Sequence, residues 1–146
     1  MLSASPALTG KVVRIYDGDT IKVENVGKVR LIGIDTPEFE SSDRDQYYLR
    51  QGISETTLRR ISSESREYLS RNIDGEIVVL TTDRETHDRH GRLLAYVHLP
   101  DGRLLNRTLL EEGLAVVYRR FDFRLKSDFI KAEKSAKLLG RGLWSE

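Results

Sequence analysis

The stretch Arg30-Leu31-Ile32-Gly33-Ile34-Asp35-Thr36-Pro37-Glu38 decides the fold of this chain. Its alternating pattern predicts a buried strand in which Arg30 lies among apolar neighbours. Pro37 cannot donate a hydrogen bond to a sheet, so we expect the strand to end near Thr36. The carboxylates of Asp35 and Glu38 then stand at a rigid strand end. With an arginine upstream they could hold a hard cation and a phosphate together, although a strand closed by a solvated acidic turn fits the same residues.

Two further strands are predicted upstream of this stretch. Residues 12–16 are rich in β-formers, and Asp17-Gly18-Asp19 is typical of a hairpin turn. Residues 20–24 alternate as a return strand, and a second turn at 25–28 leads into the central strand at Val29. The first three strands are therefore expected to form a meander.

The rest of the chain predicts a loop, three helices and two more strands. We expect a mobile loop at 39–45, helices at 54–72, from an Asn106 N-cap to Gly113, and at 122–139, strands at 76–82 and 92–99, and an extended segment at 115–118. The last helix carries an apolar stripe of Leu125, Phe129, Ala132, Ala136 and Leu139. Five strands with a helix after the third predict an α+β fold that is mainly barrel, a five-stranded Greek-key OB barrel with three helices.

The length of 146 residues suits one domain, which we place at 10–146 after a flexible tail at 1–9. No apolar run approaches a membrane span, and the absence of cysteine excludes disulfides and thiolate metal sites. The tail is too short and polar for an intact signal peptide but resembles what remains after one is removed. We therefore expect a secreted or periplasmic protein, with a cytoplasmic one as the alternative. No exposed apolar stripe demands a partner, so a monomer is expected.

Candidate metal ligands come from two strand ends. Asp19 lies at the mouth of the first hairpin, and Asp35 lies at the end of the third strand. In a meander both carboxylates can converge on one edge of the barrel, where hard oxygen ligands suit Ca²⁺ or Mg²⁺. Asp is also a common turn former, so this pattern alone leaves a purely structural role open.

Arg30 and Arg92 fall within or beside strands, where an unpaired charge is expensive to bury. Their planar guanidinium groups match phosphate oxygens. Two arginines, a divalent cation and a carboxylate such as Glu38 suffice for phosphodiester cleavage, because the cations neutralise developing charge and the carboxylate orients water. Two structural ion pairs between these arginines and carboxylates remain an equally open interpretation.

Three blocks of sequence resemble the signature motifs of the staphylococcal nuclease (thermonuclease) family. They are Asp17-Gly18-Asp19-Thr20, residues 30–38, and Asp88-Arg89-His90-Gly91-Arg92-Leu93-Leu94-Ala95-Tyr96. Weaker similarities at Leu104-Leu105-Asn106, Glu112-Gly113-Leu114-Ala115 and Gly142-Leu143-Trp144-Ser145 extend the resemblance over about residues 10–145 in the same order.

The resemblance implies an OB-fold, Ca²⁺-dependent nuclease that acts on DNA and RNA, preferentially single-stranded or locally opened, and leaves 3′-phosphate and 5′-hydroxyl ends. It implies that Asp19, Asp35 and the backbone carbonyl of Thr36 hold the ion. Glu38 would lie beside the attacking water, and Arg30 and Arg92 would clamp the scissile phosphate. All five charged residues of this set are present, which favours an active enzyme. The alternative is a catalytically weak or inactive module that binds nucleic acid or protein, and a purely structural barrel is the third interpretation.

The chain departs from the family pattern around the nucleotide. His90 stands where the family has a tyrosine, and Arg89 stands where it has a lysine. Of the family's tyrosine pair only Tyr118 remains. We expect Arg89, His90 and Tyr118 to contact substrate, with cationic stacking in place of one aromatic surface. The acidic loop after Glu38 also looks longer than in secreted members, which could narrow the groove.

Overall fold

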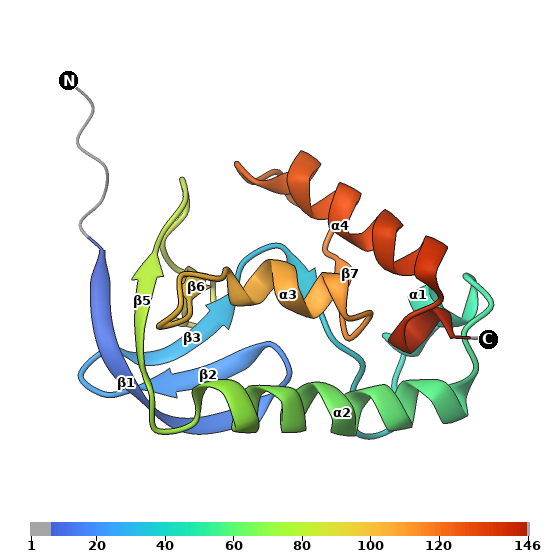
Figure 1. Ribbon diagram of the computed structural model, residues 1–146, viewed down its shortest axis with the longest axis horizontal. Helices are drawn as coiled ribbons and strands as arrows, with labels where there is room; N and C mark the ends of the chain where they lie inside the picture. Colours follow the sequence, from blue (N-terminus) through green and yellow to red (C-terminus); the bar gives the residue numbers. More distant parts are fainter. Residues whose placement is uncertain (1–6, 146) are drawn as a thin grey trace.

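The computed structural model describes residues 7–145 and contains a closed five-stranded barrel with helices packed around it (Figure 1). The strand order is β1-β2-β3-β6-β5, and β5 closes the barrel by pairing with β1. The bounds are β1 (Leu8–Asp17), β2 (Thr20–Val23), β3 (Gly27–Leu31), β5 (Ile77–Thr81) and β6 (Leu93–His98). All neighbours are antiparallel except β3 and β6. The predicted α+β fold with an OB-like barrel is thus confirmed.

The barrel begins earlier in the chain than the sequence suggested. Leu8 and Thr9, expected in the flexible tail, pair with Leu80 and Val79 of β5 as the first residues of β1. The remainder of the expected tail, residues 1–6, lies outside the described residues, and Ala7 precedes the strand.

The central strand is split, whereas a continuous strand to Thr36 was expected. β3 ends at Leu31, and β4 (Ile34–Asp35) leaves the barrel to pair with β7 (Val116–Val117). Gly33 separates the two pieces with a φ of +80°, a conformation that residues with side chains rarely adopt. Tyr118 N–H donates to the Gly33 carbonyl at 2.8 Å and holds this break in place. The split turns Asp35 out of the barrel sheet.

Residues 7–145 contain four α-helices and a short 3₁₀-helix beside the barrel, one α-helix more than expected. They are α1 (Asp45–Leu49), α2 (Glu55–Ile73), α3 (Leu105–Glu111), α4 (Lys126–Leu139) and η1 (Gly142–Trp144). α1 falls at the end of the segment predicted to be a mobile loop. A partly buried ion pair between Asp45 and Arg59 of α2, at 2.6 Å, holds it against the body of the protein.

Two helix predictions are wrong in detail. Asn106 does not cap α3, because the cap residue is Leu104 and the Asn106 side chain is fully buried. α4 begins at Lys126 rather than near 122, and its core stripe ends at Ala136 because Leu139 is 62% exposed. α2, by contrast, begins as predicted, with the Ser54 hydroxyl accepting from Thr57 N–H at its N-terminus.

The hydrophobic core fills the barrel and continues under the helices. It combines inward residues of the strands with the buried faces of α2, α3 and α4. Of the described helices, none is long and apolar enough to cross a membrane. This packing leaves the β1–β2 turn, β4 and the residues before β6 at one edge, where the candidate site lies.

Candidate active site

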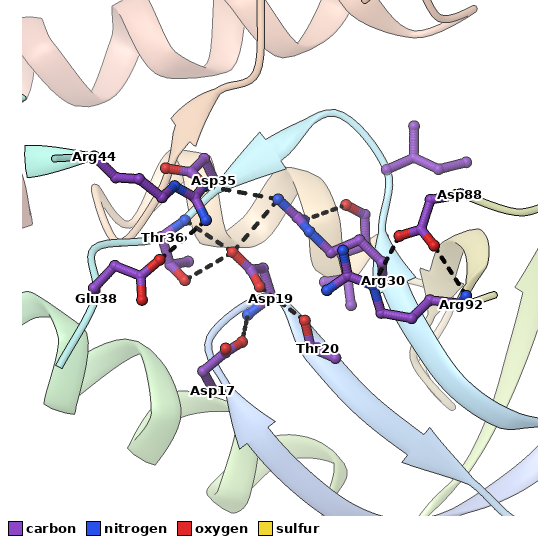
Figure 2. Close-up of polar contacts among 12 residues, drawn as sticks. Asp17, Asp19, Thr20, Arg30, Asp35, Thr36, Glu38, Arg44, Asp88 and Arg92 are labelled. Carbon is purple, nitrogen blue, oxygen red and sulfur yellow. Dashed lines mark hydrogen bonds and ion pairs between the residues drawn. The ribbon is translucent and has the colours of Figure 1, made fainter. Parts of the chain in front are cut away.

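The Asp19 carboxylate is fixed by hydrogen bonds from both sides of the site (Figure 2). Thr36 donates to its Oδ2 from the backbone N–H at 3.2 Å and from Oγ1 at 3.1 Å. Thr20 Oγ1 donates to its Oδ1 at 3.0 Å. Burial alone would raise the pKa of Asp19, but the Arg30 guanidinium and these donors outweigh it and lower the pKa. Asp19 is therefore an ionised, buried carboxylate.

Arg30 brings the two candidate ligands together. Its Nη2 lies 3.6 Å from Asp19 Oδ2 and 3.6 Å from Asp35 Oδ1. Its Nη1 donates to its neighbour's backbone, the Leu31 carbonyl, at 2.9 Å, which fixes the direction of the guanidinium. The predicted convergence of Asp19, Asp35 and Arg30 is therefore present, on side chains that are nearly buried.

Asp35 has a more crowded environment. Tyr48 of α1 donates from its hydroxyl to Asp35 Oδ2 at 2.6 Å, and Arg44 contacts Asp35 Oδ1. Burial and the nearby Asp19 charge raise the pKa of Asp35, against the opposing effects of Arg44, Tyr48 and Arg30. Burial also raises the pKa of Tyr48, with the Asp35 charge adding to the effect. Tyr48 thus remains a hydrogen-bond donor that orients this carboxylate.

Arg44 was not anticipated from the sequence. Its guanidinium spans Asp35 and Glu38, and it donates to Glu38 Oε1 at 3.0 Å. Its side chain is half exposed, and it comes from the segment expected to be a mobile loop. The sequence shows only that Arg44 follows Glu38 by six residues. This spacing does not predict a contact with Glu38 or Asp35, because the contact depends on how the loop folds.

Asp17 was expected only as a turn residue, yet it supports Asp19. Its Oδ1 accepts from the Asp19 backbone N–H at 3.0 Å. Burial, together with the Asp19 charge, raises the pKa of Asp17 to about 7. The β1–β2 turn therefore places two carboxyl groups with opposite pKa shifts next to each other.

Arg92 stands on the other side of Arg30 from the carboxylates (Figure 2). Its Nε donates to Asp88 Oδ2 at 2.7 Å, and its backbone N–H donates to Asp88 Oδ1 at 3.0 Å. Burial would raise the pKa of Asp88, but the hydrogen bonds from Arg92 lower it. Asp88 thus fixes the direction of the Arg92 guanidinium, whose two Nη atoms make no hydrogen bond or ion pair with residues 7–145.

The residues expected to bind the nucleotide lie farther out. Arg89 and His90 are exposed at the tip of the turn before Arg92, and neither side chain contacts the carboxylates among the described interactions. Tyr118 follows β7 and stacks on Phe121, with ring centres 5.5 Å apart and planes at 11°. Phe121 was not singled out from the sequence, and it supplies an exposed ring beside the one remaining tyrosine.

The donor set fits a hard divalent cation. Asp19 and Asp35 offer carboxylate oxygens close to one nitrogen of Arg30, and nitrogen or sulfur ligands are missing from this cluster. Within residues 7–145, no three His, Asp or Glu side chains gather as a complete metal cage. A cation here would therefore need ligands besides these two side chains, such as the Thr36 carbonyl and water.

Comparison with known proteins finds similarity to a nuclease family and to several of its members. A family described as staphylococcal nuclease homologue matches residues 28–146. The thermonuclease of Staphylococcus hyicus is 33% identical over 148 residues, which cover 99% of this chain and 80% of that protein. An uncharacterized endonuclease of Escherichia coli O157:H7 is 32% identical over 140 residues, covering 94% and 77%. An uncharacterized protein of Methanocaldococcus jannaschii is 36% identical over 148 residues, covering 93% and 71%.

The family match includes β3, β4 and the Arg92 turn, which supply most of the charged groups of the site. The thermonuclease alignment adds the β1–β2 turn that carries Asp19. These matches, together with the closed barrel and the cluster of carboxylates and arginines, show that the chain belongs to the staphylococcal nuclease family.

Proposed function

We propose that this nuclease depends on Ca²⁺ and hydrolyses phosphodiester bonds of DNA and RNA, leaving 3′-phosphate and 5′-hydroxyl ends. The family match and relatives named as nucleases support the activity itself. The observation that carries the site is the approach of Arg30 Nη2 to carboxylate oxygens of both Asp19 and Asp35. This approach supports one compact centre in which Asp19 and Asp35 are the anionic metal ligands and Arg30 is the cationic side chain that binds phosphate.

Asp19, Asp35 and the Thr36 carbonyl would hold the ion. When bound, Ca²⁺ supplies positive charge that favours a phosphate beside two carboxylates and stabilises the charge that develops on it. Both carboxylates are held in position before an ion binds. Thr36 and Thr20 donate hydrogen bonds to Asp19, and Tyr48 donates one to Asp35. Little reorganisation is then needed when substrate enters.

The two arginines bind the scissile phosphate from one side of the centre. Arg30 is fixed by the Leu31 carbonyl and Arg92 by Asp88, so each guanidinium is oriented before substrate arrives. Their charges neutralise the non-bridging oxygens as water adds to phosphorus. The new oxygen–phosphorus bond forms as the bond to the 5′ oxygen breaks. Arg92 donates a hydrogen bond to the departing oxygen, which becomes a hydroxyl by taking a proton from solvent water.

Glu38 orients the attacking water and accepts its proton. It is the only half-exposed carboxylate of the set Asp19, Asp35 and Glu38, so water reaches it. Its Oε1 is paired with Arg44 at 3.0 Å, and this pairing must open, or shift to the second oxygen, for Glu38 to take a proton.

The decisive experiment compares cleavage of denatured DNA and of RNA with Ca²⁺, with Mg²⁺ and with chelator. We expect cleavage only with Ca²⁺, and fragments whose 5′-hydroxyl ends can be labelled by a polynucleotide kinase without prior phosphatase treatment. Fragments with 5′-phosphates would overturn the proposed bond selection. Strand binding that survives chelation, with no cleavage under any metal, would instead support the binding module.

Site variants test the assigned roles. Glu38→Ala is expected to lower kcat about 10²- to 10⁴-fold with little change in thermal melting, because Glu38 is half exposed. Arg30→Ala is expected to lower kcat about 10²- to 10³-fold and also to lower Tm, because it leaves the nearly buried Asp19 and Asp35 without this cation, so its kcat is measured at a temperature at which the variant is folded. Glu40→Ala and Arg50→Ala remove the same charges from exposed neighbouring positions and should keep near wild-type turnover. Near wild-type kcat in either site variant would refute the assignment.

A further inference from the structure

Three basic residues face one another on the outer surface of the barrel. In the register of the sheet Arg14 of β1 pairs with Lys22 of β2, and Lys22 pairs with Lys28 of β3. Directly paired residues on antiparallel strands project from the same face, so three positive charges lie in a row. All three side chains are exposed.

This arrangement works against stability in the isolated protein. Like charges placed directly opposite one another on a sheet repel. Among the described residues, Arg14, Lys22 and Lys28 take part in no ion pair. A row of uncompensated cations that the sheet holds in register is the pattern expected of a surface whose counter-charge comes from a ligand.

Tyr16 holds two of these cations in place. The Arg14 Cζ and the Lys28 Nζ each lie 4.7 Å from the centre of the Tyr16 ring. Cations over an aromatic ring are attracted to it, so Tyr16 limits the motion of two long side chains that would otherwise diverge. We call Arg14, Tyr16, Lys22 and Lys28 the basic sheet face. Since the cations use the ring, this face offers charge rather than a stacking surface.

The basic sheet face continues directly into the candidate active site. Lys28 and Arg30 are two residues apart on β3, so they share a face and stand about 7 Å apart along the strand. Thr20, which pairs with Arg30 across the sheet, is two residues from Lys22. β1, β2 and β3 lie side by side in Figure 1, and Figure 2 shows Arg30 where β3 meets the carboxylates. The direction of β3 therefore leads from Arg30, which is proposed to bind the scissile phosphate, to the row of cations that begins at Lys28.

We propose that the basic sheet face binds phosphates of the same nucleic-acid strand whose scissile phosphate lies at Arg30. The inference rests on the proposed function, because it takes Arg30 as the anchor of the substrate. An extended single strand leaving Arg30 along β3 reaches Lys28 first and, by turning across the sheet there, then reaches Lys22 on β2 and Arg14 on β1. These contacts go to phosphates, so they add affinity and length preference without reading base sequence.

The test uses the variant Arg14→Gln/Lys22→Gln/Lys28→Gln and two substrates. One is a twenty-nucleotide oligothymidylate and the other is a dinucleotide with a single phosphodiester bond, which is too short to span the sheet. The readout is the ratio of kcat/KM for the long substrate to that for the short one. Losing three single-strand phosphate contacts reduces the slope of log affinity against log salt by about 2, so the ratio should fall about tenfold or more at low salt.

A matched variant removes three charges elsewhere. Arg71→Gln/Lys131→Gln/Lys134→Gln changes exposed positions on α2 and α4 that form no ion pair in the described part of the chain. It should keep the wild-type ratio and salt slope. An unchanged ratio in the sheet variant, or an equal fall in both variants, would overturn the proposal, since the effect would then be absent or a matter of net charge alone.

Failure of the proposed function is recognised separately. If the wild-type protein cleaves neither substrate with Ca²⁺, the nuclease proposal fails, and binding of fluorescent oligothymidylate then decides the inference. Loss of oligothymidylate affinity in the sheet variant but not in the matched variant supports it, and equal affinity overturns it. Heparin binding lost in the sheet variant while oligothymidylate binding persists would assign the face to another polyanion.

Discussion

At the scale of single residues, the main difference between sequence and structure is Arg44. Asp35 and Glu38 are predicted as ligand and proton acceptor, and Arg44 contacts both. Arg30 already lies beside Asp35, so two guanidinium groups approach one carboxylate. A cation that binds Asp35 must therefore compete with Arg44 for the same oxygen.

Arg44→Ala is expected to raise the affinity for Ca²⁺ about three- to tenfold. In the wild type, Ca²⁺ has to break the ion pair between Arg44 and Asp35, which is half exposed on the Arg44 side and costs up to about 1 kcal/mol to break. In Arg44→Ala this cost disappears, so the free energy of Ca²⁺ binding becomes more favourable by the same amount. Titration calorimetry on metal-free protein measures this directly, without substrate.

Arg50→Ala is the control for Arg44, since Arg50 is an exposed arginine just after α1 with no ion pair in the described part of the chain. Its Ca²⁺ affinity should stay close to that of the wild type. Weaker binding in Arg44→Ala than in Arg50→Ala would show that Arg44 supports the metal site instead of competing for it.

At the scale of elements, Asn106 joins α3 to the barrel. Its Nδ2 donates to the carbonyls of Ile32 and Ala95 at 2.9 and 3.3 Å, and its Oδ1 accepts from Val97 N–H at 2.9 Å. It therefore satisfies backbone groups at the place where the β3 chain leaves the barrel. A single buried amide thus bridges the break that turns Asp35 toward the site.

Asn106→Ala is expected to lower the free energy of unfolding by about 3 kcal/mol, because it leaves buried backbone groups without partners. Urea denaturation measures the loss. Asn72→Ala, which removes only a bond from a partly exposed side chain to the Tyr68 carbonyl within α2, should cost less than about 1 kcal/mol. Equal losses in the two variants would contradict the bridging role.

A second link between elements depends on pH. Asp83, just after β5, accepts from the Tyr96 hydroxyl at 2.5 Å and from Arg124 N–H, ahead of α4, at 2.8 Å. Burial would raise the pKa of Asp83, but these donors outweigh it and lower the pKa. A lowered pKa means that the unfolded chain takes up the proton first as the pH falls.

The stability that Asp83 contributes is therefore complete above its ordinary pKa of 3.8 and is lost as the pH falls through the lower value of the folded protein. Between pH 5 and pH 2.5 the wild type should lose more stability in urea titrations than Asp83→Asn. Asp43→Asn, at an exposed loop position, should follow the wild type. Parallel pH profiles for the wild type and Asp83→Asn would exclude this linkage.

At the scale of the whole molecule, the barrel could be predicted because its first strands carry local signals. Alternation and the Asp17–Asp19 turn define the meander, and with it the meeting of Asp19 and Asp35. The break at Gly33 could not be predicted, because it depends on distant packing. A Cβ at Gly33 would stand 2.5 Å from Cε2 of Phe123, ninety residues later in the chain. Arg44 and Tyr48 were missed as site residues for the same reason, since only a folded loop brings them to Asp35.

The proposed Ca²⁺ ligands, Asp19, Asp35 and the Thr36 carbonyl, come from separate parts of the chain, so bound Ca²⁺ should stabilise the entire fold. At a free concentration about 100 times the Kd, mass action adds about 2.7 kcal/mol to the free energy of unfolding, or about 5–10 °C in Tm for a chain of this size. Scanning calorimetry with Ca²⁺ and with chelator measures the shift. In Asp35→Ala the shift should largely disappear, and an undiminished shift there would place the ion elsewhere.

The pairing of β4 with β7 also has a consequence during protein synthesis. Asp35 is held by Val116, and β3 is held by β6, so the early part of the site is positioned by strands translated much later. A ribosome releases Arg30, Asp35 and Glu38 well before either partner strand emerges. The candidate site is therefore assembled only when most of the polypeptide has left the exit tunnel.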